Sequence, residues 1–191
     1  MNRALFDNIN RDVGEDDWAI CNGDWVYGVG RDNGAYLRYC QEARDSIRCK
    51  NLILIAGNHD RPWLQGFRNL FTDVYPASDR TGNTFGGLEI KVDQRRLKQF
   101  GLPLEFLGEQ WVFCHYRLMT WRSSNRGSKH FHGHNHGSLD HIVTRNCVDT
   151  GVDCWNYRAP SVVEYYEHFR TQEALPMANH HPERVERTPA L

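Results

Sequence analysis

The 191-residue sequence has no strong charge of either sign and no long hydrophobic run. Its formal net charge is −1 with histidine neutral, so no basic field points to nucleic acid or to an acidic membrane surface. The longest apolar run, Leu52 to Ala56, is far too short to span a bilayer. The first residues also lack the apolar stretch of a signal peptide. We therefore expect a cytoplasmic protein that is not bound to a membrane.

No two of the six cysteines form a C-x-x-C pair, so a zinc knuckle or a thioredoxin-like motif is unsupported. Their scatter through apolar runs suggests small core residues in a reducing compartment. The length is sufficient for one domain with its own core, and from about residue 171 the chain becomes polar and proline-punctuated. We expect one domain over residues 1–170 and a polar tail over residues 171–191.

Hydrophobic patterns predict a β–α–β unit in the first half of the chain. Residues 16–24 and 51–60 are expected strands, and residues 33–50 carry a helical apolar stripe. In such a unit the functional loops follow the carboxyl ends of the strands. The second half contains short β-rich runs between turns, which predicts a largely antiparallel region. Ser161 and Glu164 stand at capping-box spacing before a late helix.

The apolar runs end in polar motifs of a recurring kind. "NGDW" follows the first expected strand, "GNHD" follows the second, "WVFCHY" ends near a histidine, and "GHNH" follows a histidine-rich run. Taken singly, Gly-Asp and Gly-Asn are common turns, and a histidine-rich segment can be a solvated loop. Their shared position after strands favours one site, in which alternate residues of "GHNH" point the same way if the segment is extended. The candidates are Asp24, Asn58, His59, Asp60, His115, His134 and His136.

In this order, the motifs GD, GNHD, H and GHxH resemble those of the calcineurin-like metallophosphoesterase family. "HYRLMTW" and "VDTGVDCWNYRAPSVVEYY" further resemble its small bacterial and phage members, so the resemblance extends from the first residues to about residue 166. It implies an α/β fold, a four-layer α/β/β/α sandwich of two mixed sheets flanked by helices. It also implies a centre with two metal ions at the ends of the sheets.

By that resemblance, Asp24 would bridge two divalent transition metal ions. Asn58, His115 and His134 would complete the coordination of one ion, and His136 would bind the other. Oxygen and imidazole donors together suit manganese, iron, nickel or zinc.

His59 would lie over the substrate, where it would stabilise phosphoryl charge or protonate the leaving oxygen. Asp60 would be its partner and would fix the tautomer of the imidazole. The implied reaction is hydrolysis of a phosphomonoester or phosphodiester by a metal-activated hydroxide at a dinuclear site. A nucleotide or nucleic acid substrate is open but has no support from net charge, and the oligomeric state is open as well.

The sequence departs from the family at its start, because no D-x-H motif precedes Asp24. Family members carry that motif on a first strand, and its two residues bind the same ion that His136 would bind. We therefore expect an N-terminally incomplete domain. The alternative is a mononuclear or catalytically silent domain of the same fold with a binding or regulatory role.

Several other polar residues are not assigned to the site. His130 and His132 alternate on the strand before "GHNH" and are expected to pack or to face solvent. Arg61, Arg117 and Arg158 could contact phosphate, but ordinary surface positions are expected for them.

Overall fold

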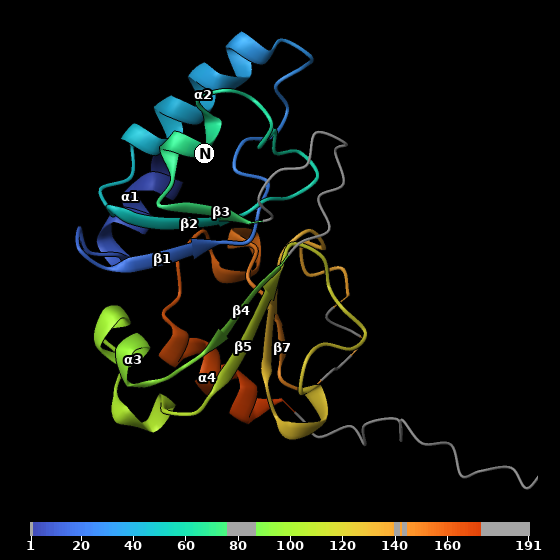
Figure 1. Cartoon of the computed structure of the whole chain (residues 1–191). Helices are drawn as coiled ribbons and strands as arrows, with labels where there is room; N and C mark the ends of the chain where they lie inside the picture. Colours follow the sequence, from blue (N-terminus) through green and yellow to red (C-terminus); the bar gives the residue numbers. More distant parts are fainter. Residues whose placement is uncertain (1, 76–86, 140–141, 143–144, 173–191) are drawn as a thin grey trace, which may run out of the picture.

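Two β-sheets organise the fold (Figure 1). The computed structural model describes residues 2–75, 87–139, 142 and 145–172. Sheet A has the strand order β1-β2-β3, and sheet B has the order β4-β5-β6-β7. Helix α2 lies on the side of sheet A away from sheet B, and α3 and α4 lie beside sheet B (Figure 1). The predicted α/β fold class with two sheets flanked by helices is therefore confirmed.

Sheet A contains the predicted β–α–β unit. It consists of β1 (Trp18–Cys21), β2 (Asn51–Ile55) and β3 (Asp73–Tyr75), and both strand pairs are parallel. Helix α2 (Asn33–Asp45) begins after Asp32, whose carboxylate accepts from the backbone of the first turn. The carboxyl ends of β1 and β2 consequently lie at the same edge of the sheet.

Sheet B is mixed, and the prediction of a largely antiparallel region is wrong. Its strands are β4 (Gly87–Lys91), β5 (Gln110–Cys114), β6 (Lys129–His132) and β7 (Cys147–Asp149). Only β4 and β5 pair antiparallel, whereas β5, β6 and β7 run parallel. The connections 115–128 and 133–146 are long enough to carry the chain back to the start of the sheet. Mixed pairing thus belongs to sheet B alone among the strands described.

The remaining helices frame these sheets. The α-helices are α1 (Asn2–Asp12), α3 (Gln94–Phe100) and α4 (Val162–Thr171). Helix α4 has the predicted capping box, in which Ser161 and Glu164 bond to each other's backbone N–H groups. Short 3₁₀ helices are η1 (Phe67–Leu70), η2 (Leu104–Phe106), η3 (Ser124–Arg126) and η4 (Val152–Trp155).

Two apolar clusters pack against opposite faces of sheet A. One joins α2 to the sheet through buried Tyr36 and Cys40. The other contains residues of both sheets and of α3 and α4: Ile53, Ile55, Ile90, Leu97, Trp111, Phe113, Phe131 and Phe169. Burial of this second cluster holds the two sheets together. It therefore also holds the strand ends of one sheet close to those of the other.

Two features bear on the setting of the protein. Among the residues described, no helix combines the length and the apolar character that a membrane span requires. None of the six cysteines, all of which lie in described residues, forms a disulfide. Most of the expected polar tail, from residue 173 onward, lies outside the described residues.

Candidate metal centre

Four strand ends supply the side chains of the candidate centre. Asp24 lies three residues after β1, and Asn58 lies three residues after β2. His115 directly follows β5, and His134 lies two residues after β6. Because β1 and β2 are parallel neighbours, as are β5 and β6, each pair delivers its two side chains to one edge of its sheet.

The four side chains converge around His115. One donor atom each from Asp24, His115 and His134 lies within 4.8 Å of the others. His115 Nε2 is 3.0 Å from Asn58 Oδ1, 3.2 Å from His134 Nδ1 and 3.4 Å from Asp24 Oδ2. Each of these atoms carries a lone pair that a cation can accept.

A backbone contact on the side away from the cluster fixes the orientation of the His115 ring. Its ring is buried, and Nδ1 lies 2.6 Å from the carbonyl oxygen of Asn22. A carbonyl can only accept, so Nδ1 holds a proton and Nε2 faces the cluster. This is how metal-binding histidines are usually oriented.

The electrostatics of the cluster favour a positive charge at its centre. Burial raises the pKa of Asp24, but a hydrogen bond from the protonated His115 ring and one from the His59 backbone lower that pKa by more, so the carboxylate stays ionised. Burial lowers the pKa of His115, but the bond to Asp24 outweighs this and leaves that pKa raised. Burial and the neighbouring His115 lower the pKa of His134. A proton on His115 and a divalent ion would thus compete for the same position.

The loops meet so closely that two glycines are required. A Cβ atom on Gly57 would lie 2.4 Å from Asp24 Oδ1 and 2.6 Å from His115 Cε1. Gly23 has a φ of +95°, and a Cβ atom there would lie 2.5 Å from His115 Nδ1. Side chains at these positions would push the loops apart.

Asp60 joins the two loops of sheet A. Its buried carboxylate accepts hydrogen bonds from the backbone N–H groups of Asp24 (2.9 Å), Trp25 (2.9 Å) and Gly57 (2.8 Å). Burial raises the pKa of Asp60 to about 6. These partners differ from the predicted one: no described contact joins Asp60 to the imidazole of His59, because the carboxylate is directed at the backbone beneath the loop.

His59 lies at the exposed side of the cluster. Its backbone N–H donates to Asp24 Oδ1 (2.9 Å), and its ring packs edge-on against that of Tyr27 at 4.6 Å between centroids. No described contact directs its imidazole toward His115. The ring is therefore free of the group formed by Asp24, Asn58, His115 and His134.

His136 does not belong to that group. Its Nδ1 lies 2.6 Å from Asp153 Oδ2 instead. His134 and His136 both have positive φ, 66° and 50°. The backbone there is not extended, so the expectation that the two side chains point the same way does not apply.

The donor set fits one divalent ion. It offers a carboxylate oxygen, an amide oxygen and two imidazole nitrogens, a mixture that suits borderline transition metals. In the part of the chain that the structure describes, Asp24, His115 and His134 are the one group of three His, Cys, Asp or Glu residues close enough to share an ion. Among the described residues, no second group of donors is gathered in the same way.

Two contributors had no clear signal in the sequence. Asn22 acts on His115 through its backbone carbonyl, which any residue type possesses. Asp153 lies in the family-like stretch "VDTGVDCW", but only the folded chain brings it to His136.

The polar residues set aside earlier have structural partners. His130 and His132 are buried in sheet B, so they pack and do not face solvent. The three arginines bond to the chain: Arg61 to Asn33, Arg117 to the carbonyl of Leu139, and Arg158 to Asp12.

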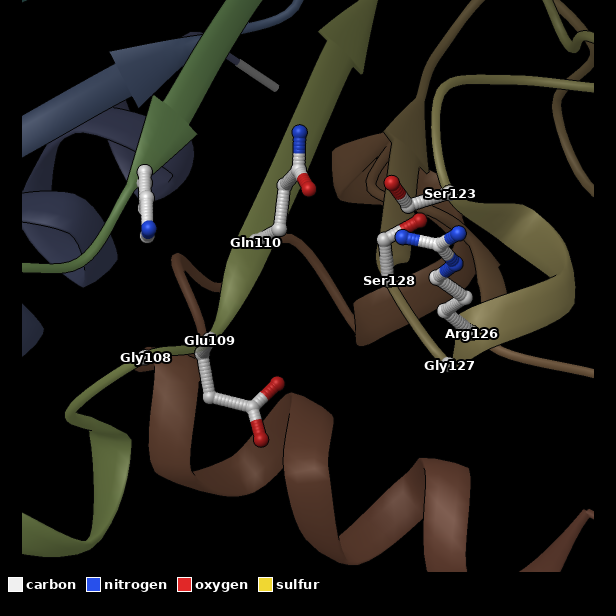
Figure 2. Close-up of a pocket in the computed structure, with 8 residues that line it drawn as sticks. Gly108, Glu109, Gln110, Ser123, Arg126, Gly127 and Ser128 are labelled. Atoms are coloured by element: carbon white, nitrogen blue, oxygen red, sulfur yellow. The ribbon is translucent and has the colours of Figure 1, made fainter.

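A separate hollow lies at the opposite ends of β5 and β6 (Figure 2). It has a volume of about 330 Å³ and is lined by Lys91, Gly108, Glu109, Gln110, Ser123, Arg126, Gly127 and Ser128. Figure 2 shows Ser123, Arg126 and Ser128 together on one side and Glu109 on the other. It contains no histidine and is not the candidate centre.

Comparison with known proteins agrees with this geometry. Neither the curated proteins nor the solved structures gave a significant match. The family model described as calcineurin-like phosphoesterase matches residues 2–158, which include every candidate residue of the centre. The chain therefore belongs to the calcineurin-like phosphoesterase family.

Proposed function

We propose that the chain hydrolyses phosphomonoesters or phosphodiesters at a dinuclear metal centre. The observation that carries this proposal is the convergence of Asp24, Asn58, His115 and His134 from four strand ends. Family membership supports metal-dependent phosphoester hydrolysis in general. When bound, divalent ions such as manganese would polarise the phosphoryl group and lower the pKa of water.

The residues of the chain prepare this chemistry. Asn22 and Asp60 hold His115 and the loop of Asp24 in place, so little reorganisation accompanies binding of an ion. The first ion would be held by the four converging side chains. His136 would hold the second ion, together with one oxygen of the Asp24 carboxylate.

His59 is proposed to act on the substrate. Its backbone N–H fixes one oxygen of Asp24, while its exposed imidazole lies outside the cluster of donors. From that position it would donate a proton or a hydrogen bond to the phosphoryl group or the leaving oxygen. Asp60 contributes only indirectly, by holding the loop that carries His59.

A specific observation favours the mononuclear alternative. In the residues that the structure describes, only one group of donors is assembled, and His136 faces Asp153. A domain that binds one ion, or that binds ions without turning over a substrate, would also have this geometry.

Ion content and activity, measured together, decide between these functions. The purified chain is freed of metal, loaded with Mn²⁺ and analysed for ions per chain. Hydrolysis of p-nitrophenyl phosphate and of its bis-ester is then measured. We expect one ion to bind tightly and a second to bind more weakly, because Asp24 and His136 alone would hold it, with turnover of at least one ester. His115→Ala should lose the first ion and lower kcat/KM at least about 100-fold. Removal of a metal ligand should lower activity at least as much as removal of a group that orients the ligand.

The control is His168→Ala, a substitution of an exposed histidine on α4 that should leave both measurements unchanged. His59→Ala should keep its ions and lower kcat alone. One ion with turnover would establish the mononuclear enzyme. Ions without turnover of either ester would establish the silent domain, and a chain that binds none would overturn the proposal.

The cellular setting is also proposed to be the cytoplasm. The six cysteines lie in described residues and form no disulfide, which supports a reducing compartment, where disulfides are rare. Fractionation of expressing cells should place the protein in the soluble cytoplasmic extract, and its recovery from an oxidising compartment would contradict this.

A further inference from the structure

The carboxylate of Asp153 is the one described hydrogen-bond partner of the His136 side chain. Asp153 Oδ2 lies 2.6 Å from His136 Nδ1. An ionised carboxylate has no hydrogen to give and can only accept. The imidazole nitrogen must therefore be the donor, so Nδ1 holds the proton and Nε2 presents its lone pair to the other side.

The distance distinguishes an orienting contact from shared coordination. Two atoms bound to one tetrahedral ion at typical ligand distances lie about 3.3 Å apart. The 2.6 Å separation is that of a charge-assisted hydrogen bond. We infer that Asp153 is a positioning residue, which holds His136 in the tautomer and orientation that present Nε2 to a second divalent cation. This inference rests on the dinuclear function proposed above.

His136 needs such a partner more than His115 does. His115 is buried and is fixed by the carbonyl of Asn22. The side chain of His136 is 72% exposed, so packing restrains it little. In a neutral histidine, the hydrogen bonds of the ring decide which of its two nitrogens carries the proton. For His136, Asp153 supplies the acceptor that the backbone supplies for His115.

The turn that carries Asp153 is itself attached to the loop that carries His136. It lies on η4, just after the turn that follows β7. At the base of this turn, Asp149 accepts from the backbone N–H of Gly137 (3.1 Å) and from that of Gly151 (2.9 Å). The loop of His136 and the turn that carries Asp153 are thus joined at a second point beside the first.

The test compares Asp153→Ala with Asp16→Ala. The second substitution removes the same group from an exposed position near Lys50 and is the matched control. The first readout is the tautomer of His136 in the metal-free protein at about pH 8, where ordinary imidazoles are neutral. Long-range ¹H–¹⁵N correlation spectra report which ring nitrogen holds the proton. The second readout is calorimetric titration with Mn²⁺.

We expect wild-type protein and Asp16→Ala to show His136 protonated at Nδ1, and Asp153→Ala to shift the proton toward Nε2. The second Mn²⁺ should bind about 10–100-fold more weakly in Asp153→Ala, with the first unchanged. An unchanged tautomer, or an equal loss at both ions, would overturn the inference. If the wild type binds a single ion and the tautomer still shifts, the dinuclear function fails while the orientation of His136 by Asp153 stands.

Discussion

Histidines that look alike in the sequence have different roles because their ring nitrogens have different partners. His115 uses one nitrogen to anchor itself and leaves the other facing oxygen donors. His130 uses both nitrogens within the fold: Nδ1 bonds to Val112 O (3.0 Å), and Nε2 accepts from the N–H of Leu118 (3.1 Å). A neutral imidazole satisfies both bonds, whereas protonation of Nε2 would break the second. His130 therefore has a structural role, because it holds the loop that follows His115 against β5 and β6.

His130 should make stability depend on pH in a defined window. Burial lowers its pKa from 6.5 to about 4. Between these values the unfolded chain binds the proton and the folded chain does not, so the stabilisation is full above pH 6.5 and is lost as pH falls toward 4. The loss should be on the order of 3 kcal/mol. Urea unfolding of wild type and of His130→Gln at several pH values measures it.

The comparison of the two proteins isolates this group. Asp60 has a raised pKa of about 6 and acts in the opposite direction, because its protonation stabilises the fold as pH falls. It contributes equally to both proteins and cancels in their difference. The stability of wild type relative to the variant should therefore fall from pH 6.5 to 4, and parallel pH profiles would contradict the assignment.

Strand ends and the glycines that follow them decide how closely the loops approach one another. Gly57 follows β2 and faces Asp24 and His115 at distances that admit only hydrogen. Gly30 lies in the connection between β1 and α2, and an added Cβ there would have nothing within 4 Å. The two glycines resemble each other in sequence, but only the first is required for the centre.

Substitution of each glycine by alanine should separate these roles. Gly57→Ala should weaken binding of the first Mn²⁺ at least about 10-fold, because disturbing the groups that support metal ligands usually lowers affinity by that much. It should also lower the melting temperature. Gly30→Ala should leave ion binding unchanged and alter stability by no more than about 1 kcal/mol. Calorimetric titration and thermal unfolding provide both measurements. Equal effects of the two substitutions would show that the crowding at Gly57 is unimportant.

The molecule as a whole holds the centre together, because its donors come from both sheets. Asp24 and Asn58 follow strands of sheet A, and His115 and His134 follow strands of sheet B. The apolar cluster between the sheets is therefore the part of the fold on which the distances among these donors depend. Phe131 is 1% exposed in this cluster and stacks on Phe113 at 4.8 Å between ring centroids.

Phe131→Ala should lower the free energy of unfolding by about 3–5 kcal/mol, the usual cost of a large cavity in a core. Because both sheets share this cluster, unfolding should remain a single transition in which secondary structure and bound Mn²⁺ are lost at the same urea concentration. Circular dichroism and ion release, followed in parallel, test this. Release of the ion well before loss of secondary structure would show that the sheets separate independently.

Local features were sufficient to predict several elements. The β–α–β unit, the capping box of α4 and the polar motifs at strand ends all depend on residues close together in the chain. The family resemblance added which of those motifs belong together, and the match over residues 2–158 confirms the family. The roles proposed for the individual residues stay predictions.

Contacts between distant residues were decided only by the tertiary structure. The direction of β5, β6 and β7 depends on where the long connections return, and runs of three to five residues are too short to fix the direction of pairing. His115 is oriented by a backbone carbonyl 93 positions away, which leaves no mark in the side-chain sequence. Asp60 faces the backbone and Asp153 faces His136 for the same reason: a carboxylate binds whichever donors the packed sheets bring to it.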